Sequence, residues 1–242
     1  MKTKRAILSL VWLLARVACA QDSLEEVVVT GMRSADVAIP GTSLKRPGDF
    51  ILLTVEVSND SRDEKTRKSE IDATLRAMIA AASKDKSIEL SVIGDNSLVL
   101  PLKLDSATLR LLHGKRPDTS ETTINVKTRI PAQVGNSSAL VAKLKDFATN
   151  IKPVGRTIID GDGDFEISIV NPMQYRDRVI ELMAGDVKKV TAALGPEYKV
   201  VLRGIDHPIQ WVRDGMLELT IFVPYSYDVL PASVTSYLKT SD

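Results

Sequence analysis

Hydrophobic residues alternate with polar ones in several short segments of the chain, and this period of two predicts β-strands. The clearest segment is 122–130, where Ile124, Val126 and Ile130 share one face. The same pattern predicts further strands at 50–57, 88–92, 98–103, 154–160, 164–170, 198–203 and 216–223. Because a turn sequence separates 154–160 from 164–170, we expect these two strands to pair as a hairpin.

Other segments repeat their apolar residues with the helical period. The first helix follows Ser61, which with Glu64 fits a capping box, and its apolar stripe is Ile71, Leu75, Met78, Ile79 and Ala82. A second helix is expected from about Ser137. The longest begins at Asn171-Pro172, where Asn suits the N-cap, and ends at Gly195-Pro196. A short helix over 106–112 is a further expectation.

The predicted order is strand–helix–strand–strand twice, followed by a helix and two closing strands. Strands with one polar face indicate antiparallel sheets that helices cover on one side. We therefore predict an α+β fold of antiparallel sheets with helices packed on one face, built from repeated β-α-β-β units over residues 49–227. Residues 21–48 are predicted to be a flexible N-terminal arm, and 228–242 a polar tail.

Residues 1–20 have the pattern of a secretory signal peptide. Basic residues precede an apolar segment, Ala6 to Ala15, and Ala18-Cys19-Ala20 forms the cleavage site. The pattern predicts export to the periplasm of a Gram-negative bacterium, with outer-membrane association left open. A lipoprotein that retains Cys19 is the alternative, although Arg16-Val17-Ala18 is a poor lipobox.

Cleavage after Ala20 would remove four of the 32 basic side chains and none of the 31 acidic ones, which leaves a formal charge of −3. A mildly acidic chain argues against nucleic acid or anionic lipid as a partner. The only cysteine would leave as well, so the mature chain could use neither a disulfide nor a thiol nucleophile. A hydrophobic content of 44% suits a protein with a buried core.

The stretch LEEVVVTGMR, residues 24–33, combines β-branched residues with a closing glycine. It resembles the TonB box at the mature N-terminus of TonB-dependent outer-membrane receptors. The resemblance implies contact with a partner by strand addition, through Glu25, Glu26, Val27, Val28, Val29, Thr30 and Gly31. The chain has no room for a receptor's plug and barrel, so it would be an accessory of the TonB system. The alternative is that this segment is an edge strand of the protein's own sheet, or an unstructured leader.

The order of elements resembles that of the SIMPL-domain family of bacterial envelope proteins. The likeness covers residues 48–227 and includes the late helix 175–194, the strand 198–202 that follows it, and the final strand 217–223. The late helix here has fewer alanines than is usual in the family. Membership would imply a periplasmic or outer-membrane-associated protein that is often oligomeric, with no established enzymatic residues to carry over.

Signals for chemistry are sparse. Residues 160–164 read DGDGD, which resembles a calcium loop, but Phe165 and Asn171 occupy the positions where an EF-hand needs Gly and Glu. We expect a tight turn there. His113 and His207 lack a metal-ligand pattern, and the common nucleophile and nucleotide motifs are missing. We therefore predict no catalytic residue, metal or cofactor.

Three aromatic residues, Trp211, Tyr225 and Tyr227, lie near the closing strands, either as a contact patch or as part of the core. The leading hypothesis is a non-enzymatic periplasmic protein that acts through protein contacts and self-association, with no membrane span in the mature chain. The alternatives are the TonB accessory and an enzyme or ligand carrier with a cleft between the two layers.

Overall fold

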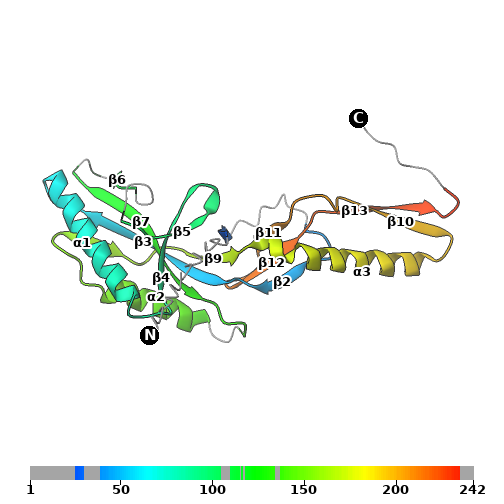
Figure 1. Cartoon of the computed structure of the whole chain (residues 1–242), viewed down its shortest axis with the longest axis horizontal. Helices are drawn as coiled ribbons and strands as arrows, with labels where there is room; N and C mark the ends of the chain where they lie inside the picture. The colour runs from blue at the N-terminus through cyan, green and yellow to red at the C-terminus, as the bar shows by residue number, and fades with distance from the viewer. Residues whose placement is uncertain are drawn as a thin grey trace, which may run out of the picture.

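The computed structural model describes residues 25–29, 39–104, 110–114, 116, 118–133 and 137–234 (Figure 1). This part of the chain is a mixed α and β structure in which every strand pairing is antiparallel. Its helices are α1 (Glu64–Ala82), α2 (Ser137–Asn150) and α3 (Arg176–Leu194), with short 3-10 turns η1 (Asp95–Ser97) and η2 (Pro172–Tyr175). The predicted class, α with antiparallel β, is confirmed at this level.

The largest sheet has the order β1-β9-β3-β7-β4-β5, with β6 paired to β7 and β8 paired to β3. Its strands are β1 (Glu26–Val29), β3 (Phe50–Asn59), β4 (Glu89–Ile93), β5 (Val99–Pro101), β6 (Leu112–His113), β7 (Ser120–Arg129), β8 (Thr157–Asp160) and β9 (Phe165–Val170). Two smaller sheets have the orders β11-β12-β2 and β10-β13. Their strands are β2 (Leu44–Pro47), β10 (Tyr198–Arg203), β11 (Gln210–Arg213), β12 (Glu218–Phe222) and β13 (Ser226–Pro231).

Strands β3 and β7 form the centre of the main sheet and pair along all of their length, from Phe50↔Arg129 to Asn59↔Ser120. Alternate residues of β3 point to opposite faces. One face presents fully buried aliphatic side chains to α1 and α2, namely Ile51, Leu53, Val55 and Val57 of β3, Ile71, Leu75 and Met78 of α1, and Leu144 of α2. The other face carries a smaller core of Val28, Phe50, Leu52 and Val99. The apolar alternation therefore sets the faces as predicted.

The N-terminus of α1 differs from the predicted capping box. The N-cap is Asp63, whose carboxylate accepts the backbone N–H of Thr66 at 2.8 Å. Ser61 instead donates its hydroxyl to Glu70, and its carbonyl accepts from Arg67. Asp is as good an N-cap as Ser, and starting at Asp63 leaves Ser61 available for this network.

The hairpin predicted between residues 154–160 and 164–170 is wrong. Both β8 and β9 pair with β3, β8 with its C-terminal half and β9 with its N-terminal half. They are two parts of one strand, and Gly161–Asp164 forms an irregular bulge between them. Gly163 is required there because a Cβ would lie 2.3 Å from the Thr54 carbonyl oxygen. The predicted strands and long helices occur in the predicted order, with further strands β1, β2, β6, β11 and β13 among them. The pairing of β8 and β9 differs from the β4–β5 hairpin, so two equivalent β-α-β-β units are not established.

Asn171 does not cap the longest helix as predicted. It adopts a left-handed conformation, with φ of 45°, and makes no capping hydrogen bond through its side chain. Its backbone N–H donates to the Glu25 carbonyl, which ties this corner to β1. The helix starts through η2 instead, and α3 begins at Arg176. Asn tolerates the left-handed region better than most residues, which explains its presence at this sharp turn.

Two regions that were predicted to be irregular contain strands. The expected N-terminal arm, residues 21–48, includes β1 and β2, and the expected tail begins within β13. Of the short helix expected over 106–112, residues 106–109 lie outside the described residues, and Leu112 belongs to β6. Short strands of this kind depend on distant partners, which no local pattern shows.

The molecule is elongated, with a body at one end and an arm at the other (Figure 1). The body contains the main sheet with α1 and α2. The arm consists of α3 and the two-stranded ribbon β10–β13, which lie along the long axis. The β11-β12-β2 sheet lies between them, and β2 runs on through Gly48 into β3. At its 19 residues, α3 alone extends about 28 Å.

Candidate functional site

The predicted partner-binding segment is part of the protein's own sheet. Residues Glu26 to Val29 pair with Val170 to Ile167 of β9, and the three valines are between 1% and 8% exposed. Thr30 and Gly31 lie outside the described residues. In the sheet order, β1 has β9 on one side, and its other edge makes a single bridge from Val27 to Leu98. The edge-strand interpretation describes the arrangement of Glu26–Val29 seen here.

Glu26 of this segment enters a buried ionic cluster. It forms an ion pair with Lys127 of β7, and the side chains are 11% and 8% exposed. The hydroxyl of Ser168 donates to Glu26 at 2.5 Å, and Lys127 lies 3.3 Å from Glu89. The Lys127 ammonium also lies 4.1 Å from the centre of the Phe50 ring. A buried pair of this kind is strongly destabilised if one partner is removed, because the other charge is left without compensation.

The arm, which consists of α3 and the β10–β13 ribbon, extends away from the body of the molecule (Figure 1). Its ribbon pairs Tyr198↔Pro231 through Arg203↔Ser226, and residues paired in this way share a face. One face is apolar throughout, with Tyr198, Val200, Leu202, Tyr227, Val229 and Pro231. The other carries Lys199, Val201, Arg203, Ser226, Asp228 and Leu230, including an ion pair between Arg203 and Asp228. The two faces of the ribbon thus differ sharply in chemistry.

Much of the apolar face is exposed. Leu202 packs against the main core, but Tyr198, Tyr227 and Val229 are 45%, 39% and 43% exposed. We call these three residues the ribbon patch. Within the described part of the chain, β10 and β13 pair only with each other, so each has one edge without a strand partner. Exposed aromatic and β-branched side chains beside unpaired strand edges are typical of protein contact surfaces.

The three aromatic residues near the closing strands play different parts. Trp211 on β11 and Tyr225 pack against the main core. The Tyr225 hydroxyl donates to Asp186 of α3 at 2.8 Å, and burial together with this neighbouring carboxylate raises the pKa of Tyr225. Tyr227 alone belongs to the exposed ribbon patch. Trp211 and Tyr225 therefore pack where the arm joins the rest of the molecule, and Tyr227 is available for contact.

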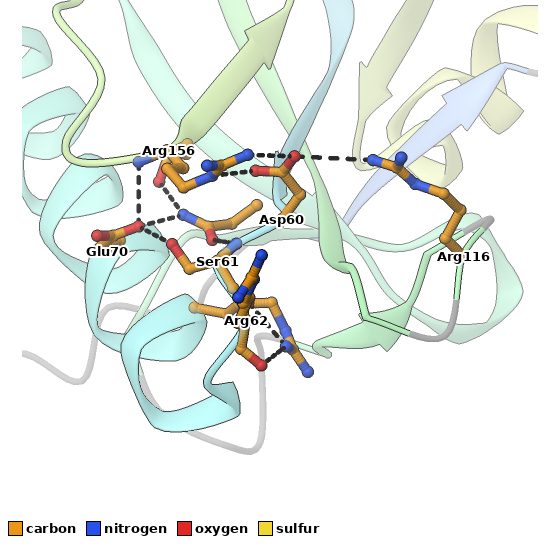
Figure 2. Close-up of polar contacts among 9 residues, drawn as sticks. Asp60, Ser61, Arg62, Glu70, Arg116 and Arg156 are labelled. Atoms are coloured by element: carbon orange, nitrogen blue, oxygen red, sulfur yellow. Dashed lines mark hydrogen bonds and ion pairs between the residues drawn. The ribbon is translucent and has the colours of Figure 1, made fainter.

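A dense polar network links α1 to the segment before β8 (Figure 2). The Glu70 carboxylate accepts from Asn59 at 2.7 Å, from Ser61 at 2.8 Å and from the Arg156 backbone at 3.1 Å. These donors, led by Asn59, lower the pKa of Glu70. Asp60 accepts two hydrogen bonds from Arg156, and these lower its pKa as well. Carboxylates held in the charged form by so many donors are suited to structure rather than to proton transfer.

The other chemical candidates are placed as follows. Residues 160–164 include the last residue of β8 and the bulge that follows it, where the Asp160 carboxylate accepts the Asp162 backbone N–H. His113 lies in β6, and His207 contacts the Pro224 carbonyl at 2.9 Å. Within the described ranges, no three histidine, cysteine, aspartate or glutamate side chains are grouped to hold a metal ion. None of the described helices has the length and apolar character needed to cross a membrane.

Comparison with known proteins adds no relative. No protein-family model matches the chain, and no curated protein matches its sequence. The resemblances to the SIMPL domain and the TonB box therefore stay predictions. Neither the ionic cluster nor the ribbon patch could be predicted from the sequence, because each joins residues that are far apart in the chain. Alternating apolar residues at 198–202 were a visible signal for one side of the patch.

Proposed function

We propose that the protein is exported to the periplasm and acts without catalysis, by binding other proteins and further copies of itself through the arm. Export is inferred from the signal pattern of residues 1–20. The body would serve as an α+β scaffold of the SIMPL type, including its repeated units, that holds the arm away from the main sheet. Under this proposal the chain is a structural component of the cell envelope.

The observation that carries the proposal is the ribbon patch. Tyr198, Tyr227 and Val229 lie on one apolar face of a two-stranded ribbon, each more than a third exposed. An isolated two-stranded ribbon is weakly stable, and here α3 lies alongside it (Figure 1). Packing of this face against the ribbon of a second copy would cover its apolar side chains, and strand pairing at the free edges would extend the sheet. Aromatic residues at such contacts often contribute most of the binding free energy.

Light scattering of the purified mature chain tests self-association. We expect an oligomer, and we expect the double substitution Tyr227→Thr and Val229→Thr to shift it toward monomer. Threonine keeps the β-propensity of the strand while removing apolar surface. A loss of about 1–2 kcal/mol per contact would weaken association roughly 5- to 30-fold for each residue.

The matched control is Arg203→Thr, on the opposite face of the same ribbon. Its exposed ion pair with Asp228 contributes little to stability, so association should be unchanged. Circular dichroism verifies that all variants remain folded. A monomeric wild-type chain, or equal association of both variants, would contradict the role of the patch.

A further inference from the structure

A pocket of about 380 Å³ lies between β1 and the β4–β5 hairpin. Residues 98–101 and Leu90 form its apolar wall, and Glu25, Glu26, Glu89 and Lys127 supply its charged groups. Its volume is within the range of small-molecule sites, toward the small end. The pocket is distant from the arm and plays no part in the function proposed above.

The pocket exists because β1 meets the hairpin at one point only. Val27 and Leu98 form a single antiparallel bridge. A regular ladder would continue from this bridge by pairing Glu26 with Val99, but no such pairing forms. The two backbones separate on this side of the bridge. Apolar side chains of the hairpin line the resulting space together with the acidic side chains of Glu25, Glu26 and Glu89.

The charges of the pocket do not balance. Its described lining includes three carboxylates and one lysine, a formal charge of −2. Glu26 is already engaged through both oxygens, one with Lys127 and the other with Ser168. Glu89 lies 3.3 Å from the same lysine, but half of its side chain remains exposed. Glu25 is exposed as well. The surplus negative charge therefore belongs to Glu25 and Glu89.

A buried hydroxyl next to the pocket adds a second observation. Ser91 is 1% exposed, and its Oγ has no hydrogen-bond partner among the described residues. It lies two residues after Glu89 on the same face of β4, and pairs with Pro101 of the pocket wall. Burying a hydroxyl without a partner is unfavourable, so this position behind the pocket wall calls for an explanation. A polar group bound in the pocket, directly or through a water molecule, would supply the missing partner.

We propose that this pocket binds a small organic cation, an ammonium group attached to a compact apolar body. The ammonium group is held by Glu89 and Glu25, and the apolar body lies against residues 98–101. Lys127 acts as a positioning residue that fixes Glu26 and Glu89. An anionic ligand would meet the surplus negative charge, and a neutral ligand would leave it uncompensated.

Calorimetric titration of the purified chain with phenethylamine tests the proposal. Phenethyl alcohol and hydrocinnamate, which have similar apolar bodies but neutral and anionic ends, serve as comparison probes. We expect saturable binding of the amine and at least tenfold weaker binding of the other two. Absence of saturable amine binding, or equal binding of the alcohol or the acid, overturns the proposal.

The substitution Glu89→Gln locates the site. It removes one charge with almost no change in volume, and the half-exposed position lets the variant fold. We expect amine affinity to fall at least tenfold, whereas Glu64→Gln, on the exposed start of α1, leaves it unchanged. Amine-induced NMR shifts should centre on residues 98–101. Unchanged affinity of the Glu89 variant, or shifts centred elsewhere, would show that the amine binds at a different place.

Discussion

Glu70 is a residue whose ionisation is tied to the fold by several hydrogen bonds. Its carboxylate is the meeting point of donors from Asn59, Ser61 and the Arg156 backbone. Gly155, at φ of 61°, lets this backbone approach, because a Cβ there would lie 2.1 Å from the Glu70 carboxylate. A neutral side chain at position 70 would accept these hydrogen bonds less strongly.

Glu70→Gln is expected to lower stability at neutral pH. Because the folded state lowers the pKa of Glu70, the wild-type advantage is present above the ordinary pKa of a glutamate. It is lost as the pH falls through the lowered value, since the carboxyl is then protonated in both states. Urea unfolding at pH 7 and at acid pH should give a difference between the two chains that shrinks with acid. A difference that is constant with pH would assign the effect to shape alone.

At the scale of elements, alanine substitution of one crowded glycine and one uncrowded glycine tests the geometry described for the β8–β9 bulge and for α3. The Gly163 Cβ position lies against the Thr54 carbonyl at 2.3 Å, whereas Gly185 in α3 has nothing within 4 Å. Gly163→Ala must displace the strand backbone and should destabilise the protein by about 1–3 kcal/mol. Gly185→Ala should stabilise it by about 0.5–1 kcal/mol, because alanine favours the helix.

Thermal unfolding of the two alanine variants measures both effects. Because the substitution is chemically identical, the opposite signs depend only on position. If Gly163→Ala were neutral, the bulge at residues 161–164 would have to differ from the one described. If Gly185→Ala were destabilising, position 185 would be packed against another part of the protein, such as a second copy.

Elements with long regular patterns could be predicted from the sequence, and those that depend on distant partners could not. The alternation in β3 and β7 and the apolar stripe of α1 are sufficient to predict these three elements without knowing their partners. By contrast, β2 contains a single aliphatic residue, Leu44, and forms a strand because β12 pairs with it. The separation of β8 from β9 was visible, but their shared partner β3 was not.

The functional surfaces could not be predicted for the same reason, because their residues are far apart in the sequence. Glu26 was singled out in the sequence as part of a contact segment, but its partner Lys127 is 101 residues away. Nothing near either residue indicates the pairing. The same holds for the ribbon patch, since Tyr227 and Val229 are brought opposite β10 only by the return of the chain through β11 and β12.

At the scale of the whole molecule, export can be tested directly. Expressed in a Gram-negative host, the chain should be found in the periplasm with a mass that corresponds to cleavage after Ala20. Ala18→Arg, which spoils the small residue needed before the cleavage site, should block this processing. Mass spectrometry of periplasmic and cytosolic fractions checks both outcomes. An intact leader on a cytosolic chain would contradict export.

The pairing of β10 with β13 also dictates an order of events during synthesis. β10 is made before β13, and the two meet only after the β11–β12 hairpin has turned the chain back. The strands of the main sheet are complete by Val170, and the last residue of the main core, Val223, is made before β13 begins at Ser226. The arm is therefore the last region able to fold. Until then the apolar side chains of β10 stay exposed, and they form a segment to which a chaperone would bind.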